Sequence, residues 1–176
     1  MNIIVYLASS ANGMISTKTN VPDWLSQEYG RGLLAISERT KAVIMGRTTY
    51  EILAPNHLPL QEEGTLIVLT HDMTATPPQP NVVFTQVTPN DVVRMLEARG
   101  HQEAVIIGGT QTVSTFMKAR LVDELYLVVE PVLFDGGLPL LRDVDADYKM
   151  RLLDVQKLNP HTVQLHYHLI REDMRE

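Results

Sequence analysis

The chain contains no cysteine, which excludes a disulfide framework and any metal site built from thiolates. It also lacks a cluster of Lys and Arg, and its formal net charge is −6. Because binding to a nucleic-acid backbone needs clustered positive charge, we expect no nucleic-acid partner. The apolar N-terminal run, residues 1–8, has no basic flank and ends at polar Ser9, well short of a membrane span. We therefore expect a cytoplasmic protein with no membrane partner.

The composition is that of an ordinary globular protein. Apolar residues make up 44% of the 176 positions and charged residues 20%, both near the averages for globular domains. The Pro-rich stretch 76–80 is too short to be a domain linker and predicts a surface loop. We expect a single domain over residues 1–176.

Apolar runs rich in β-branched residues predict the strands, and most are separated by stretches with helix signals. This alternation favours a mostly parallel sheet. Two further segments flank Asn159-Pro160, and the alternation in the second predicts an antiparallel hairpin. The fold class is therefore α/β with three layers: a central mixed sheet, helices on both faces and a C-terminal hairpin. The predicted strands are residues 3–8, 42–46, 65–69, 82–85, 103–107, 124–130, 150–156 and 162–170.

Local signals define two helices besides those that follow glycine turns. Residues 89–99 predict a helix in which Thr88 is the N-cap, Asp91 completes a capping box and Gly100 ends the helix. A second helix is expected near residues 22–38, where apolar side chains recur on one stripe.

Two strands run directly into glycine and then into a helix pattern. In the first, residues 43–51, Gly46 precedes Arg47; in the second, residues 105–110, a pair of glycines precedes Thr110. Glycine lets the backbone approach an anion, and a helix N-terminus offers unpaired N–H groups. The two junctions could serve one nucleotide with several phosphates. The first could also be a plain strand-to-helix turn, and the glycine pair of the second could serve only close helix–sheet packing.

Four motifs in this order resemble the dihydrofolate reductase-like superfamily. They are similar above all to the C-terminal reductase domain of the bifunctional riboflavin-biosynthesis deaminase/reductase and its stand-alone relatives. The resemblance covers nearly the whole chain and implies an NADPH-dependent reductase that is a homodimer, with the C-terminal strands near the dimer contact. The motifs are residues 43–51, 66–70, 106–109 and 121–127, followed by residues 130–137.

The resemblance also implies which residues bind NADPH. The first loop would close over the nicotinamide, the two glycine junctions would approach the phosphates, and the end of the strand at 65–69 would border the adenosine and its 2′-phosphate. The matching positions are Ala8, Gly13 and Ile15; Gly46, Arg47 and Thr48; Leu69, Thr70 and His71; and Gly108, Gly109, Thr110, Gln111 and Thr112.

The chain departs from the proteins that it resembles at several positions. Gly30 stands where folate reductases have a helical carboxylate, and Val128 replaces their strand threonine. Ile107 stands where the riboflavin-pathway reductase usually has glutamate, and Asn12 replaces a frequent aspartate in the first loop. Three alternatives remain open: a substrate like that of dihydrofolate reductase, a nucleotide-binding module without turnover, and a flavodoxin-like domain, whose Ser/Thr-rich phosphate loop residues 9–13 match only in part.

Hydride transfer also needs a proton source. Asp23 and Glu28 are the candidate catalytic carboxylates, and Trp24 is a candidate to cover a substrate ring. Each also has a structural explanation, since Asp23 suits the first turn of a helix, Glu28 a solvated helix face and a lone tryptophan the core.

We expect no metal site. The acidic run 143–147 lacks the glycine and the closing glutamate of a calcium loop. His166 and His168 share a strand face, but no third ligand accompanies them in the sequence.

Overall fold

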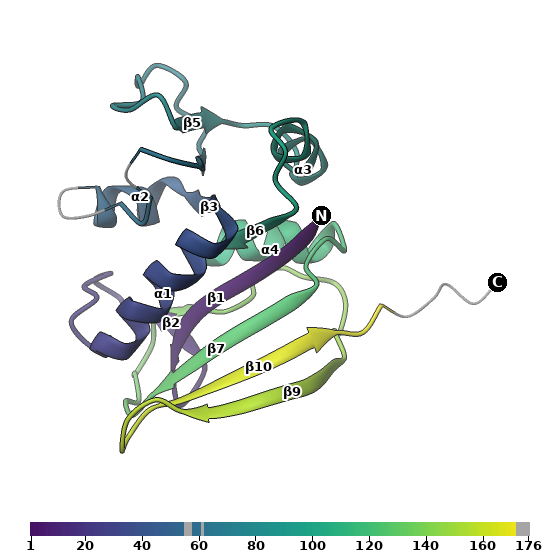
Figure 1. The fold of residues 1–176 in the computed structure, drawn as a ribbon. Helices are drawn as coiled ribbons and strands as arrows, with labels where there is room; N and C mark the ends of the chain where they lie inside the picture. Colours follow the sequence, from purple (N-terminus) through teal and green to yellow (C-terminus); the bar gives the residue numbers. More distant parts are fainter. Residues whose placement is uncertain (55–57, 61, 172–176) are drawn as a thin grey trace.

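The computed structural model describes residues 1–54, 58–60 and 62–171. An eight-stranded sheet of order β5-β4-β3-β6-β1-β7-β10-β9 runs through it (Figure 1). The pairings from β5 to β7 are all parallel, whereas β10 is antiparallel to both β7 and β9. The predicted mixed, mostly parallel sheet with a C-terminal hairpin is confirmed. Its strands are β1 (Asn2–Ser10), β3 (Ala42–Gly46), β4 (Thr65–Leu69), β5 (Val82–Thr85), β6 (Glu103–Ile106), β7 (Glu124–Glu130), β9 (Met150–Lys157) and β10 (Val163–Leu169).

Helices cover both faces of the sheet and complete the three layers. Alternate residues of β1 point to opposite faces, as the two-residue period of a strand requires: Ile4 and Tyr6 belong to one core cluster, Ile3 and Val5 to the other. The first cluster lies under α1 and α2, the second under α3 and α4. The helices are α1 (Gln27–Thr40), α2 (Arg47–Leu53), α3 (Pro89–Ala98) and α4 (Thr110–Lys118).

The predicted helix over residues 22–38 was wrong at its start. Helix α1 begins at Gln27, because Ser26 adopts an extended backbone and its hydroxyl accepts the Tyr29 N–H at 3.2 Å. Ser26 is fixed in turn by Glu130, whose carboxylate accepts its N–H at 2.9 Å and its hydroxyl at 2.6 Å. Residues 22–26 therefore form turns ahead of the helix.

Helix α3 follows its local signals closely. Thr88 caps it by accepting the Asp91 N–H at 3.3 Å, and the Thr88 hydroxyl donates to the Asp91 carboxylate at 2.6 Å. Gly100 has a φ of +86°, the left-handed conformation that ends a helix.

A second, two-stranded sheet was absent from the prediction. It pairs β2 (Met14–Ser16) with β8 (Leu138–Pro139), which joins the loop after β1 to the segment after β7. Among the residues that the structure describes, no helix is both long and apolar enough to cross a membrane.

Candidate nucleotide-binding edge

The two glycine junctions meet at the carboxyl edge of the sheet. Strands β3 and β6 are parallel neighbours, and the Gly46 N–H donates to the Gly108 carbonyl at 2.9 Å. The Gly108–Gly109 peptide bond is cis. A Cβ atom at Gly46 would lie only 2.9 Å from the Thr112 hydroxyl of α4. The close approach that the sequence indicated for these glycines is thus present, and it brings both junctions to one place.

Thr49 contributes to this contact, although the sequence prediction named only Thr48. The Thr48 side chain is exposed, whereas a Cβ atom at Gly108 would lie 3.1 Å from the Thr49 hydroxyl. Both threonines occupy the first turn of a seven-residue helix, and the sequence carries no signal that tells which of them turns inward.

The N-terminus of α4 has the features of an anion site. The N-cap is Gly109, which carries no side chain to cap the first-turn N–H groups. The Thr110 hydroxyl donates to the Pro139 carbonyl at 2.5 Å, and Thr112 is buried against Gly46, whereas Gln111 is exposed. Of the three predicted α4 positions, Gln111 therefore has the freest side chain, and Thr110 also anchors the segment after β7.

Arg47 lies along the sheet edge. Its Nε donates to the Glu51 carboxylate at 2.7 Å, and its guanidinium lies 5.1 Å from the ring centre of Phe84 and 5.9 Å from that of Tyr50. The hydrogen bond with Glu51 raises the pKa of Arg47. The Nη1 atom is buried and has no hydrogen-bond partner among the described residues. A buried guanidinium donor without a partner is what an absent anionic ligand would leave behind.

The turn after β4 is folded by its own side chains. Thr70 is buried, and its hydroxyl accepts the Asp72 N–H at 3.1 Å. Asp72 in turn accepts the N–H and hydroxyl of Thr74 at 2.9 and 2.6 Å. These bonds, and then the charge of Arg47, lower the pKa of Asp72. Leu69 ends β4 and His71 is exposed, so the predicted residues border the edge but Asp72 was missed.

The first loop is held at the other end of this edge. Ala8 lies within β1, Gly13 has a φ of +89° in the following turn, and Ile15 lies in β2. The Asn12 amide donates to the Phe134 carbonyl at 2.8 Å and accepts the Phe134 N–H at 3.1 Å. An ionised aspartate at this position could accept the Phe134 N–H but could not donate to the Phe134 carbonyl. Asparagine therefore adds a second hydrogen bond between the first loop and the segment after β7.

The three candidates near α1 occupy different surroundings. Trp24 lies edge-on to Phe134, with ring centres 5.2 Å apart, and packs against the first core cluster. Glu28 accepts a hydrogen bond from Asn159 at 3.0 Å, which lowers its pKa. Asp23 is exposed in the turn before α1. Trp24 therefore borders the loops of the edge, while Glu28 is directed to the β9–β10 turn.

A buried carboxylate escaped the sequence prediction. Glu130 is 1% exposed and, besides Ser26, accepts the Thr162 hydroxyl at 3.0 Å. Burial, and then the negative charge of Glu130, raises the pKa of Tyr6 to about 12. The Tyr6 ring stacks on Tyr29 with ring centres 5.3 Å apart, and burial, and then the nearby Tyr6, raises the pKa of Tyr29. In the sequence, only the position of this glutamate at the end of an apolar strand indicated that it could be buried.

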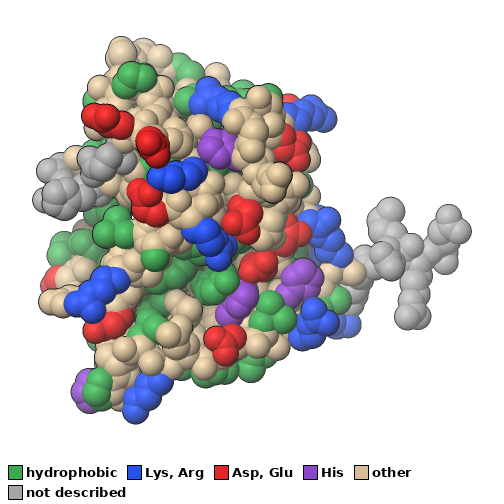
Figure 2. All heavy atoms as spheres, viewed as in Figure 1, with side chains coloured by type: hydrophobic (Ala, Val, Ile, Leu, Met, Phe, Trp, Pro, Cys, Tyr) green, Lys and Arg blue, Asp and Glu red, His purple; other side chains and the backbone are tan. Residues whose placement is uncertain are grey.

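The charged side chains that the structure describes elsewhere form no broad basic surface. Figure 2 shows acidic and basic side chains interspersed over the face that carries α1, with no broad patch of one sign. His166 contacts Glu124 at 2.7 Å and stacks on Tyr126 at 3.9 Å. Among the described residues, no three His, Asp or Glu side chains are grouped so as to hold a metal ion.

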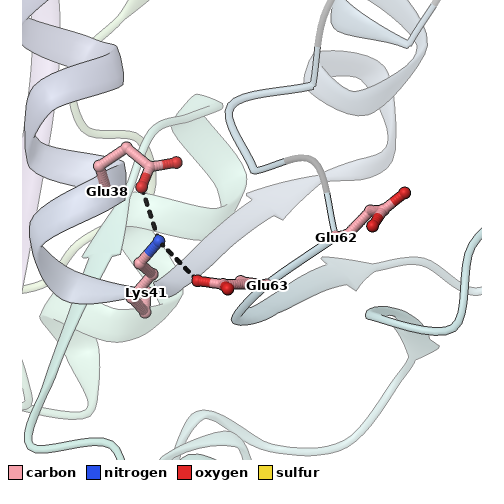
Figure 3. A pocket seen from close by; sticks show the side chains of 4 residues that line it. All are labelled: Glu38, Lys41, Glu62 and Glu63. Carbon is pink, nitrogen blue, oxygen red and sulfur yellow. Dashed lines mark hydrogen bonds and ion pairs between the residues drawn. The ribbon is translucent and has the colours of Figure 1, made fainter.

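A surface hollow of about 320 Å³ lies apart from the glycine junctions (Figure 3). Its lining residues precede β3 and β4, at the opposite edge of the sheet. Lys41 contacts Glu38 at 2.6 Å and Glu63 at 3.4 Å, and Glu62 points away from them. The hollow is lined by solvated ion pairs and lies outside the nucleotide-binding edge.

Comparison with known proteins agrees with this architecture. The sequence model of the RibD C-terminal domain matches residues 1–164. The uncharacterized protein YwjB of Bacillus subtilis (strain 168) is 33% identical over 174 residues, which cover 93% of this chain and 95% of YwjB.

Solved structures show the same fold. A protein from Shewanella sp. PV-4, whose name provisionally assigns it to riboflavin biosynthesis, superimposes with a TM-score of 0.81 at 25% identity, over 97% of this chain and 100% of the other. The Thermotoga maritima diaminohydroxyphosphoribosylaminopyrimidine deaminase/5-amino-6-(5-phosphoribosylamino)uracil reductase gives a TM-score of 0.75 at 16% identity, over 96% of this chain and 56% of that enzyme. The chain belongs to the RibD C-terminal domain family, as its motifs indicated.

Proposed function

We propose that the protein is an NADPH-dependent reductase that transfers a hydride to a small heterocyclic or carbonyl-type substrate, in a reaction like that of 5-amino-6-(5-phosphoribosylamino)uracil reductase. The observation that carries the proposal is the meeting of the two glycine junctions. They place the uncapped N-terminus of α4 and the guanidinium of Arg47 along one edge of the sheet. A dinucleotide needs a row of anion-binding groups of this kind.

The residues present fit the cofactor. The order β5-β4-β3-β6-β1-β7 changes direction around β3, β6 and β1, and ligands of open α/β sheets bind where the strand order reverses. The buried Nη1 of Arg47 lacks a partner among the described residues, as a phosphate-binding donor would in a protein without ligand. Formal charge does not attract the cofactor, because the chain carries −6 overall; binding would depend on the local donors.

Each side chain would then have a limited task. The nicotinamide would supply the hydride when bound. Gly109 would leave room for the phosphates beside the first-turn N–H groups of α4, and Arg47 would hold the adenosine end. Asn12 would fix the first loop, while Trp24 and Phe134 would exclude water from the mouth of the site. Asp23 is the proposed proton source.

A nucleotide-binding module without turnover is the second candidate. It is favoured because two nearby carboxylates are already used in hydrogen bonds within the protein: Glu28 accepts from Asn159, and Glu130 accepts from Ser26 and Thr162. The two candidates are separated by incubating the protein with NADPH and a panel of aminouracil and carbonyl compounds. Oxidation of NADPH that depends on one compound supports the reductase; cofactor binding without oxidation supports the module.

We also propose that the protein is a homodimer. Strand β9 ends the sheet, and its Leu152, Leu153 and Val155 side chains are 50%, 46% and 53% exposed. An apolar edge strand of this kind is usually covered, and a second copy of the chain would cover it. Sedimentation equilibrium should give twice the chain mass for the wild type and a shift toward monomer for Val155→Lys. A monomeric wild type would contradict the proposal.

A further inference from the structure

The carboxyl ends of β3, β4 and β5 share one stretch of the sheet edge, and Arg47 crosses it. Gly46 is opposite Leu69, and Leu69 is opposite Thr85. The guanidinium of Arg47, at the end of β3, reaches the ring of Phe84 in β5. A ligand that continues along this edge from the glycine junctions toward β5 therefore meets the guanidinium and the turn after β4.

The positive charge at this place is already balanced. Glu51, one turn farther along α2, contacts Arg47 at 2.7 Å. Asp72 lies in the turn after β4, the neighbour of β3 in the sheet, and its charge also raises the pKa of Arg47. One positive charge is thus accompanied by two carboxylates, so a phosphate at this place would depend on directed hydrogen bonds rather than on an excess of positive charge.

The Asp72 carboxylate is held in position. Thr70 accepts the Asp72 N–H, and the Asp72 Oδ1 accepts both donors of Thr74. A carboxylate has about four acceptor positions, and Asp72 is exposed, so it can accept another donor. In Rossmann folds, a carboxylate about 20 residues after the glycine-rich turn binds a ribose 2′-hydroxyl, whereas a nearby arginine accommodates a 2′-phosphate. Here the arginine follows β3 and the carboxylate follows its neighbour β4.

We propose that Asp72 is a specificity-determining residue that opposes the 2′-phosphate and accepts the 2′-hydroxyl, so that it reduces the preference of the protein for NADPH over NADH. This role rests on the proposed function, since it requires a dinucleotide at the glycine junctions. Arg47 attracts the 2′-phosphate while Asp72 repels it.

Calorimetric titration of the full chain with NADPH and, separately, NADH tests the role of Asp72. The two Kd values of the wild type should agree within about tenfold. Asp72→Asn keeps the Oδ1 acceptor for Thr74 but removes the charge; it should shift the Kd ratio toward NADPH by about tenfold, the size of effect expected for one unit charge near a protein surface. Glu63→Gln removes an equal charge at the opposite edge of the sheet and should leave the ratio unchanged.

The outcomes separate this role from the proposed function. If neither dinucleotide binds, the proposed function fails and the role of Asp72 fails with it. If NADPH binds and Asp72→Asn leaves the Kd ratio at its wild-type value, the reductase proposal stands and Asp72 has no part in specificity. If Glu63→Gln shifts the ratio of the two Kd values as much as Asp72→Asn does, the shift reflects the net charge of the protein. That result would also overturn the role of Asp72 in specificity.

Discussion

Replacement of Arg47 by alanine should weaken NADPH binding far more than it weakens the fold. A hydrogen bond from a charged donor to a phosphate contributes about 1.5–3 kcal/mol, which corresponds to a rise in Kd of roughly 10- to 100-fold. On the stability side, the Arg47 and Glu51 side chains are 30% and 59% exposed, and a pair of this kind, four residues apart on a helix, contributes about 0.3–0.5 kcal/mol. The contact with Phe84 adds about 0.5–1 kcal/mol.

The two effects are measured separately. Calorimetry gives the Kd for NADPH, and thermal unfolding without ligand should show a Tm lower by about 2–4 °C for a loss near 1 kcal/mol. Arg94→Ala is the matched control, because Arg94 also pairs with a carboxylate on its own helix and is 76% exposed. An Arg47→Ala protein with wild-type affinity would refute the assignment of Arg47 to the site.

Three further predictions concern the glycines and the proton source. Gly109→Val should abolish calorimetric dinucleotide binding with little change in Tm, since a Cβ atom there meets only Thr49 Oγ1, at 3.6 Å; normal binding would leave the glycine a packing role alone. Asp23→Asn should lower kcat by about 10²- to 10⁴-fold, the usual contribution of a general acid, with the NADPH Kd unchanged; a normal kcat would remove Asp23 from the reaction. Gly32→Ala should cost about 1–3 kcal/mol in chemical denaturation, because its Cβ atom would collide with the Tyr6 hydroxyl, whereas Gly30→Ala, which meets nothing within 4 Å, should stabilise by up to about 1 kcal/mol; equal stabilities would contradict this packing.

The sheet was predictable because its signals are local. The parallel strands contain apolar runs rich in β-branched residues, β10 alternates, and α3 carries its own cap, capping box and stop in the residues from Thr88 to Gly100. The start of α1 depends instead on Glu130, which is distant in the sequence and fixes Ser26 only in the folded protein. The β2–β8 pair could not be predicted either, because strands of three and two residues are too short to show a periodicity.

The candidate site shows a similar division. Gly46 and Gly108 could be found from the strand–glycine–helix pattern, because glycine is required where two backbones approach. The inward side of Thr49 and the position of Asp72 depend on how helix α2 and the turn after β4 are rotated. The first is set by packing, as in the edge-on contact of Tyr50 with Phe84 of β5, and the second by side-chain hydrogen bonds within the turn, so the strand–glycine–helix motif alone could not reveal them.

Titration of the purified wild-type protein with NADPH by calorimetry tests the central claim most directly. Saturable binding at one site per chain, lost in Gly109→Val, is the result predicted by the meeting of the two glycine junctions at one edge. Absence of heat with both NADPH and NADH, from protein shown to be folded by its thermal unfolding, would contradict a dinucleotide site at that edge.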